Sequence, residues 1–341
     1  MTAKRKTSYQ VTDLHAAGEP VRIITDGAPK LTGASLLAKR QQAIDRYDGV
    51  RQLLMFEPRG HADMYGVWPT EADAPGCALA VLFMHNAGYS TMCGHATIAL
   101  GRWVIDQGIV AATPPLTQFT LQCPCGPVNV RVETTPEGNP GEVTFDSVPA
   151  FAATLDTPIR LNNDRVVSVD LAYGGAYYAI LPASRLGMDL TATPVDKLIA
   201  MGRQITAAGR EQLTIQHPGE AALGFLYGCI LTDDAGPPST QLSRNLCIFG
   251  GGQVDRSATG SGITARLALA HARQQAKIGE TFTFAGLSGV PFQGQIESIK
   301  KTGEVIVSVT GKGFYSGESR FWLEADDPLP VGFSASKTRM G

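Results

Sequence analysis

Apolar and polar positions alternate along much of this chain with the two-residue period of a half-buried β-strand. Turn-forming residues such as Pro136-Glu-Gly-Asn-Pro140 separate the alternating stretches. The strands predicted in this way cover residues 9–15, 21–24, 53–56, 77–84, 118–122, 128–133, 142–145, 165–169, 177–181 and 224–232. Between residues 117 and 148 the strands follow one another closely, which is typical of an antiparallel meander.

Four segments have the helical period instead. They cover residues 33–48, where Gly49 is the expected end, and residues 94–107, 195–204 and 260–270. The second and fourth of these helices consist mostly of alanine, leucine, isoleucine and threonine, so they are apolar almost all round. A helix of this kind is expected to be covered by protein on several sides. We therefore expect each of the two to be surrounded by a sheet.

The two apolar helices begin with similar sequences. When Ser90–Trp103 is aligned with the second helix start, Thr259 matches Cys93 (259 − 93 = 166 positions apart), Gly260 matches Gly94 and Ser261 matches His95. Two copies of one helix-start motif imply two similar domains. Gly260-Ser-Gly262 lacks the third glycine of a dinucleotide-binding loop, so this class of ligand is not favoured.

Cys93 stands where a reactive thiol is expected. The N-terminus of a helix carries a partial positive charge and unpaired N–H groups, which favour a thiolate and bind anions. A buried structural thiol is the alternative, and the surrounding motif favours catalysis. His61 and Asp63 are a second candidate pair, for which a structural role in a loop is the simpler interpretation.

Length and composition narrow the function further. A chain of 341 residues exceeds the usual size of one core, so we expect two domains. A net charge of −2 with 18% charged residues favours neither nucleic acid nor an anionic membrane as partner. A small molecule is the expected ligand, and a homodimer stays open. The sequence has no apolar run long enough to span a membrane, and no apolar segment after the first basic residues that would make a cleaved signal.

The cysteines bear on location and on metal binding. Six cysteines without zinc-ligand spacing are typical of reduced thiols in the cytoplasm. Cys123-Pro-Cys125 has no second pair, and zinc sites normally need one. We expect a cytoplasmic protein with no metal site.

Several motifs together resemble the proline racemase family. They are Gly18-Glu-Pro20, Glu57-Pro-Arg-Gly-His-Ala-Asp-Met64, Met92-Cys-Gly-His95, Ala172-Tyr-Gly-Gly175 and Asp255-Arg-Ser-Ala-Thr-Gly-Ser-Gly262. The resemblance runs from about residue 11 to about residue 317. It implies an α/β fold like that of the diaminopimelate epimerases: two similar domains, each a curled, mostly antiparallel sheet around a central helix. It places the active site in the cleft between them and implies no cofactor. The expected domains are residues 1–150 with 316–341, and residues 151–315.

The resemblance also assigns roles to the site residues. In racemases and epimerases of this family both helix-start positions are cysteines, one on each face of the substrate ring. Here the second is Thr259, whose hydroxyl has no accessible anion near neutral pH. This Cys/Thr pair is similar to that of the family members that dehydrate trans-3-hydroxy-L-proline, as are Ser261 and Ala176. Ala258 departs from the proline expected there, which affects loop rigidity more than chemistry.

We therefore expect a cofactor-independent hydro-lyase. In trans-3-hydroxy-L-proline the α-hydrogen and the 3-hydroxyl lie on one ring face, so one thiolate on that face serves both. Cys93 is the expected base and Thr259 a hydrogen-bonding group on the far face. The backbone at Gly94, His95, Gly260 and Ser261 is expected to bind the carboxylate, and Asp255 with His95 to fix the ring nitrogen and carboxylate.

Other interpretations of the same residues stay open. Thr259 is alternatively a plain helix N-cap, and Asp255 a structural partner of Arg256 or of a loop N–H. The alternative functions are a proline racemase or hydroxyproline 2-epimerase, and a non-catalytic protein that binds proline analogues.

Overall fold

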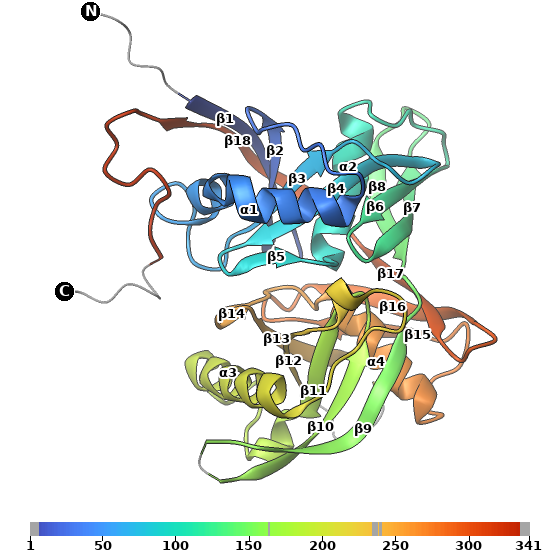
Figure 1. The fold of residues 1–341 in the computed structure, drawn as a ribbon. Helices are drawn as coiled ribbons and strands as arrows, with labels where there is room; N and C mark the ends of the chain where they lie inside the picture. Colours follow the sequence, from blue (N-terminus) through green and yellow to red (C-terminus); the bar gives the residue numbers. More distant parts are fainter. Residues whose placement is uncertain (1–6, 163, 234–237, 239–240, 335–341) are drawn as a thin grey trace, which may run out of the picture.

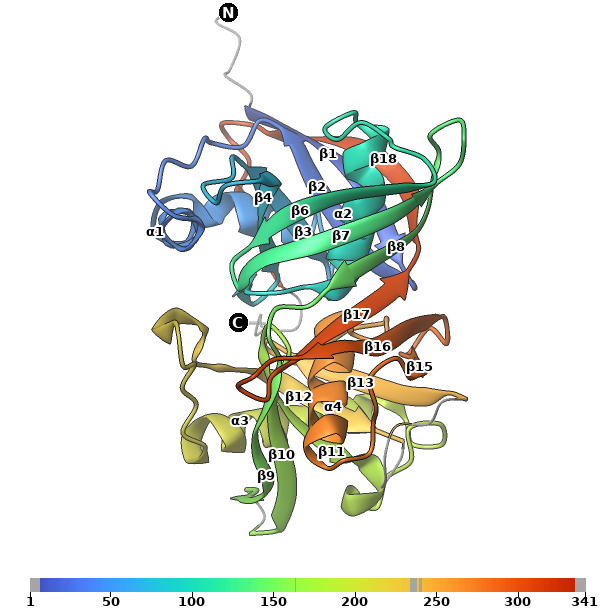
Figure 2. The same ribbon diagram turned by 90° about the vertical axis from the view of Figure 1, so that its right-hand side faces the viewer.

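The chain folds into two stacked lobes, each with a curled sheet around one helix (Figures 1 and 2). The computed structural model describes residues 7–162, 164–233, 238 and 241–334. The strands are β1 Thr7–Ala16, β2 Glu19–Asp26, β3 Tyr65–Thr70, β4 Cys77–His85, β5 Gly88–Ser90, β6 Leu116–Cys123, β7 Gly126–Thr134, β8 Pro140–Asp146, β9 Phe151–Arg160, β10 Val166–Tyr173, β11 Tyr177–Pro182, β12 Leu226–Thr232, β13 Ser243–Phe249, β14 Gln253–Val254, β15 Thr281–Ala285, β16 Pro291–Ile299, β17 Val305–Gly311 and β18 Gly313–Leu323. The helices are α1 Leu36–Met55, α2 Gly94–Asp106, α3 Val195–Gln212 and α4 Gly260–Ala272, with short 3₁₀ turns at Ala183–Leu186 and Ala221–Leu223.

The two lobes repeat one topology. In the first, the strand order is β18-β1-β2-β3-β4-β6-β7-β8, with β5 beside β4. In the second, it is β9-β10-β11-β12-β13-β15-β16-β17, with β14 beside β13. The parallel pairs also correspond, β2–β3 with β11–β12 and β4–β6 with β13–β15. The two similar domains expected from the sequence are therefore present.

The domains join along equivalent strands. β8 of the first domain pairs antiparallel with β17 of the second, with Ser308 opposite Asp146. After β17 the chain returns to the first domain, where β18 pairs with β1. The predicted limits near residues 150 and 316 stay predictions, and those at residues 1 and 341 lie outside the described part of the chain.

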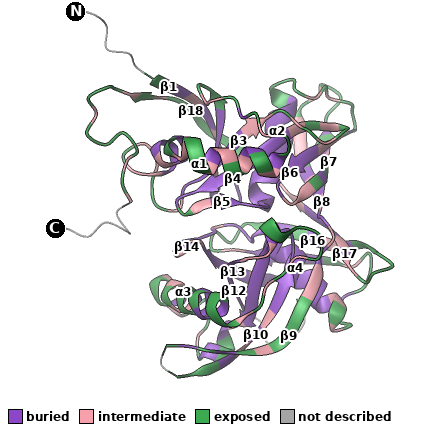
Figure 3. Ribbon diagram, viewed as in Figure 1, coloured by how far each residue is buried: buried purple, intermediate pink, exposed green. Residues whose placement is uncertain are grey.

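The central helices α2 and α4 are buried along almost their whole length (Figure 3). Helix α2 packs against strands β1, β2, β7, β8, β17 and β18, and α4 against β9, β10, β11, β16 and β17. Small side chains permit this enclosure. A Cβ on Gly101 of α2 would lie 2.4 Å from Cγ1 of Val143 on β8, closer than real contacts allow. The expectation that a sheet surrounds each of these two helices is confirmed.

The predicted strand at residues 53–56 is wrong. Helix α1 continues through Gly49 to Met55, with non-helical backbone angles only at Tyr47. Gly49 has no positive φ, so it does not end the helix. Val50, Leu53 and Leu54 continue the buried face, because residues three and four apart lie on one side of a helix. Local β-propensity misled the prediction, and burial on one helix face decided the structure.

The remaining differences between prediction and structure are one helix that is longer than predicted and several strands that were not predicted. Helix α3 continues to Gln212, beyond the predicted end at residue 204. Strands β3, β5 and β9, and every strand after β12, have no counterpart among the predicted strands. No helix among the described residues is both long enough and apolar enough to cross a membrane.

Candidate active site

Cys93 is the N-cap of α2. Its Sγ accepts a hydrogen bond from the Ala96 N–H at 3.4 Å, and the side chain is buried. The Cys93 carbonyl accepts bonds from the Thr97 N–H at 3.0 Å and the Thr97 hydroxyl at 2.7 Å, so the first turn is firmly held. A thiolate at this position faces the positive end of the helix dipole. The sulfur therefore lies at a helix end that attracts negative charge.

His95 lies beside the thiol. Its Nδ1 and Nε2 are 3.3 and 3.4 Å from Cys93 Sγ, and Nδ1 is 3.7 Å from Asp255 Oδ2. Burial lowers the pKa of His95, but the negative charges of Cys93 and Asp255 outweigh it and raise that pKa well above its ordinary value. The imidazole therefore lies between the Cys93 sulfur and the Asp255 carboxylate, and its contacts with both favour its protonated form.

Asp255 connects the two halves of the site. Burial alone would raise its pKa, but His95 and hydrogen bonds from Ser257 and Thr259 hold that pKa below its usual value. Its Oδ1 accepts the Ser257 N–H at 2.8 Å, and its Oδ2 the Thr259 hydroxyl at 2.9 Å. Two structural partners were considered for Asp255 from the sequence. The bond to a loop N–H is present, at Ser257, whereas the Arg256 side chain binds Glu19.

Thr259 precedes α4 as Cys93 precedes α2, but its side chain does not cap the helix. Its φ of 59° lies in the left-handed region, which is costly for a β-branched residue. The hydroxyl turns to Asp255 instead. Thr259 is thus the N-cap of α4 by position, but its hydroxyl makes no capping bond because it donates its hydrogen bond to the Asp255 carboxylate.

The two helix ends meet backbone to backbone. A Cβ on Gly94 would lie 2.5 Å from Gly260 Cα, and a Cβ on Gly260 would lie 2.8 Å from Gly94 Cα. Neither position accepts a side chain without movement of the backbone. Glycine at both positions thus lets the N–H groups of α2 and α4 converge on one small region, which is the arrangement that binds an anion.

Residues of the first domain hold the segment that carries Asp255. Asp63 Oδ1 accepts the Val254 N–H at 3.2 Å, and Glu19 Oε2 accepts the Arg256 N–H at 2.8 Å and Nη1 at 3.2 Å. Burial and the charge of Asp255 raise the pKa of Glu19 to about 8. The structural interpretation of the His61 and Asp63 loop fits these contacts, since Asp63 joins the domains and the His61 ring is exposed beside the Ala62 carbonyl.

Most of the expected site residues line one cavity, whose free volume is about 10 Å³. Those that line it are Cys93, Gly94, His95, Asp255, Thr259 and Ser261; Gly260 abuts Gly94 at its edge. Among the residues described, no group of three or more His, Cys, Asp or Glu side chains is arranged to hold a metal.

The sequence did not identify the remaining lining residues, which are Tyr65, Met92, Tyr178, Tyr227, Cys247 and Phe249. Most lie on strands β3, β11, β12 and β13. The Tyr178 hydroxyl is 2.7 Å from Ser261 Oγ, and the Tyr65 ring meets His95 edge-on at 4.8 Å between centroids. Tyr65 directly follows the motif that ends at Met64, and this adjacency was the one available signal.

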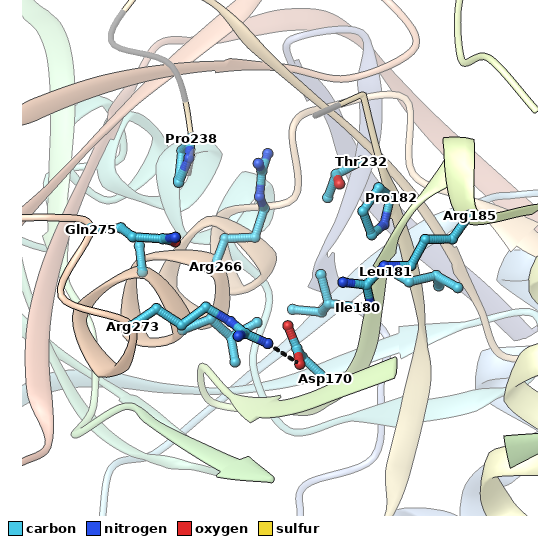
Figure 4. Close-up of a pocket in the computed structure, with 12 residues that line it drawn as sticks. Asp170, Ile180, Leu181, Pro182, Arg185, Thr232, Pro238, Arg266, Arg273 and Gln275 are labelled. Carbon is cyan, nitrogen blue, oxygen red and sulfur yellow. Dashed lines mark hydrogen bonds and ion pairs between the residues drawn. The ribbon is translucent and has the colours of Figure 1, made fainter. Parts of the chain in front are cut away.

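A second cavity lies in the second domain, beside α4 (Figure 4). Three arginines line it, but Arg273 already binds Asp170 at 2.7 Å and Asp156 at 2.9 Å. None of the residues singled out in the sequence faces this cavity. The candidate active site is therefore the cavity whose lining comes from both domains.

Several known proteins are similar to this chain over nearly its whole length. The proline racemase family model matches residues 11–334. A trans-L-3-hydroxyproline dehydratase of Saccoglossus kowalevskii is 43% identical over 94% of this chain and 99% of its own. The human trans-3-hydroxy-L-proline dehydratase is 42% identical over 95% and 93%, and the proline racemase of Clostridioides difficile 34% identical over 97% and 99%.

A solved structure shares the fold. The hydroxyproline epimerase of Agrobacterium vitis, with bound trans-4-OH-L-proline, matches with a TM-score of 0.89 at 24% identity, over 97% of this chain and 96% of its own. The domain repeat, the facing helix ends and these matches lead to one conclusion. The chain belongs to the proline racemase family.

Proposed function

We propose that this protein is a trans-3-hydroxy-L-proline dehydratase, a hydro-lyase that releases water and forms Δ1-pyrroline-2-carboxylate. The observation that carries the proposal is the pair of opposed helix starts, one with a thiol and one with a hydroxyl bound to a carboxylate. Relatives described as dehydratases of this substrate, at 42 and 43% identity, support it.

The first step is removal of the α-proton. Cys93 is the base, because its sulfur lies at a helix N-terminus and beside the His95 cation. Negative charge then develops on the substrate carboxylate. The N–H groups at Gly94, His95, Gly260 and Ser261 stabilise that charge where the two helices converge.

Thr259 explains why elimination is favoured over inversion. Two-base inversion needs a group on the far face that returns a proton to the α-carbon. The Thr259 hydroxyl donates a hydrogen bond to Asp255 and has no accessible anionic form near neutral pH, so it does not exchange protons with the α-carbon as a thiol would. Asp255, held as a carboxylate, is placed to bind the cationic ring nitrogen.

Loss of the 3-hydroxyl completes the reaction. The C3–O bond breaks, the oxygen leaves as water with one added proton, and the enamine tautomerises to the cyclic imine. No electron passes to or from another molecule, so the proposal requires no cofactor. We further propose a cytoplasmic location, which the six unpaired cysteines support. A homodimer stays a prediction.

The test is incubation with trans-3-hydroxy-L-proline, trans-4-hydroxy-L-proline and L-proline in deuterated water, followed by mass and chiral analysis. The proposal predicts loss of one water from the 3-hydroxy compound alone. Inversion of the 4-hydroxy compound or of proline, with a deuterium at the α-carbon, would indicate an epimerase or racemase. Binding of pyrrole-2-carboxylate without exchange or elimination would indicate a non-catalytic relative.

A further inference from the structure

The leaving hydroxyl needs a proton, and one buried phenol in the cavity has an unused hydroxyl. Among the residues that the structure describes, seven buried side-chain polar atoms have no hydrogen-bond partner. Tyr65 Oη is the one of these that belongs to a residue lining the catalytic cavity. A buried hydroxyl without a hydrogen-bond partner is energetically costly, so a group that arrives with the substrate is its natural partner.

A second phenol of the cavity, Tyr178, is already engaged. It is buried, and its hydroxyl is 2.7 Å from Ser261 Oγ. Tyr65 begins β3, where it pairs with His85 of β4. Its ring is fixed by an edge-on contact with His95 and a stacked contact with His85 at 5.7 Å. The Tyr65 ring is therefore held in place. Its hydroxyl interacts with Ser90 and Cys93, but with neither in ordinary hydrogen-bond geometry.

Tyr65 also belongs to the same side of the site as Cys93. Both residues come from the first domain, whereas Thr259 comes from the second. Burial first, and then the charge of Cys93, raises the pKa of Tyr65 well above its ordinary value. The phenol therefore keeps its proton at every working pH and is available as a donor near the Cys93 sulfur.

We propose that Tyr65 is a further catalytic residue, whose phenol gives its proton to the 3-hydroxyl as the C3–O bond breaks. This inference rests on the proposed function. The Cys93 thiolate takes the α-proton and becomes a thiol. The Tyr65 proton then passes to the leaving oxygen while the thiol proton passes to Tyr65 Oη. Water is released, and thiolate and phenol are both restored.

The order of these transfers follows from burial. A tyrosinate left alone in this apolar cavity would be strongly disfavoured, so the two proton transfers occur together. The relay also uses the stereochemistry of the substrate, because the α-hydrogen and the 3-hydroxyl lie on one ring face. The Cys93 side of the cavity can serve both positions without a second base.

The test compares two leaving groups in wild-type protein and in Tyr65→Phe. Hydroxide needs a proton in order to leave, whereas chloride does not. With trans-3-hydroxy-L-proline, Tyr65→Phe should lower kcat about 10²-fold, the lower end of general-acid contributions. With the corresponding 3-chloro-L-proline, whose chloride replaces the hydroxyl on the same face, wild type and variant should eliminate at similar rates.

Deuterium exchange supplies a second readout. In deuterated water Tyr65→Phe should return 3-hydroxyproline labelled at the α-carbon, because Cys93 still removes that proton while loss of the hydroxyl is blocked. Tyr173→Phe is the matched control, since it removes another buried hydroxyl without a partner from a residue outside the cavity. Its kcat should remain that of wild type.

The outcomes separate the two proposals. If wild type does not dehydrate 3-hydroxyproline, the proposed function fails. If wild type does so and Tyr65→Phe is unimpaired, or is impaired equally with both leaving groups, the role of Tyr65 is overturned. Should the variant not fold, 3-fluorotyrosine at position 65 keeps the shape and lowers the phenol pKa. If 3-fluorotyrosine leaves the ratio of the elimination rates from the 3-hydroxy and the 3-chloro substrate as it is in wild type, the proposal is rejected.

Discussion

Cys93 and Thr259 occupy equivalent positions in two domains of one topology, yet their surroundings differ. Cys93 has an extended backbone with φ of −148° and directs its sulfur to its own helix. Thr259 has φ of 59° and directs its hydroxyl to Asp255. The repeated fold supplies two facing helix ends, each able to bind negative charge. The side chain and its partner decide which end transfers a proton.

The largest effect is expected when the thiol is removed. Cys93→Ser should lower kcat for dehydration by about 10⁴-fold, the upper end of what a general base contributes, because an alcohol is hardly ionised at neutral pH. Single-turnover kinetics measure the loss. Cys77→Ser, at a half-buried thiol outside the cavity, is the control and should retain activity. A Cys93→Ser enzyme with more than a tenth of wild-type activity would rule out the assigned base.

The next effect concerns the carboxylate that both halves share. Asp255→Asn should lower kcat/KM by about 10³-fold, because it removes the counter-charge of His95 and the acceptor of the Thr259 hydroxyl. The His95 pKa should fall, since Asp255 is one of the charges that raises it.

The pH profile checks the same coupling. Activity that needs the His95 cation is lost as pH rises through its folded-state pKa. The activity of wild type should therefore not fall near pH 6.5, the ordinary pKa of histidine. It should fall only at more alkaline pH. In Asp255→Asn the alkaline decline should move toward neutral pH. Identical profiles in the two proteins would contradict the His95–Asp255 coupling.

A smaller effect should follow from separating the helix ends. Gly94→Ala would place a Cβ 2.5 Å from Gly260 Cα, so the backbones must move apart. A displacement of this size is expected to cost about 10²-fold in kcat/KM, mostly through KM for the carboxylate substrate. Gly317→Ala, where a Cβ meets open space, is the control. Initial-rate measurements across substrate concentration separate the two constants, and an unchanged KM would count against the carboxylate site.

The smallest effect should come from the second helix start. Thr259→Val keeps the shape and removes one hydrogen bond to a charged group, which corresponds to about a tenfold loss of kcat/KM. Thr259→Cys is the sharper variant. It restores a thiol on the far face and should introduce α-proton exchange with inversion of 4-hydroxyproline, measured by chiral chromatography in deuterated water. No inversion in a folded Thr259→Cys protein would show that more than this residue separates the two chemistries.

Much of the fold followed from local pattern. The helical period and small residues of α2 and α4 predicted both their positions and their enclosure, because a helix repeats within a few residues. The end of α1 was misplaced, since Gly49 is a stop signal only when its backbone adopts a positive φ. The edge strand β18 was missed because its partner β1 lies at the other end of the chain. Strand β9 pairs with the next strand, β10, but its middle residues are exposed and give no buried alternation.

The sequence by itself determined which groups have chemistry to offer. Cys93 with Gly94, and Thr259 with Gly260, are contiguous motifs, so their roles could be inferred from neighbouring residues alone. Only the tertiary structure decided that Asp255 of the second domain lies 3.7 Å from His95 of the first, and that Tyr65 of β3 lines the same cavity as Cys93. The physical reason is distance along the chain. Residues on separate strands and domains meet only when the sheets curl around their helices, and no local period records that meeting.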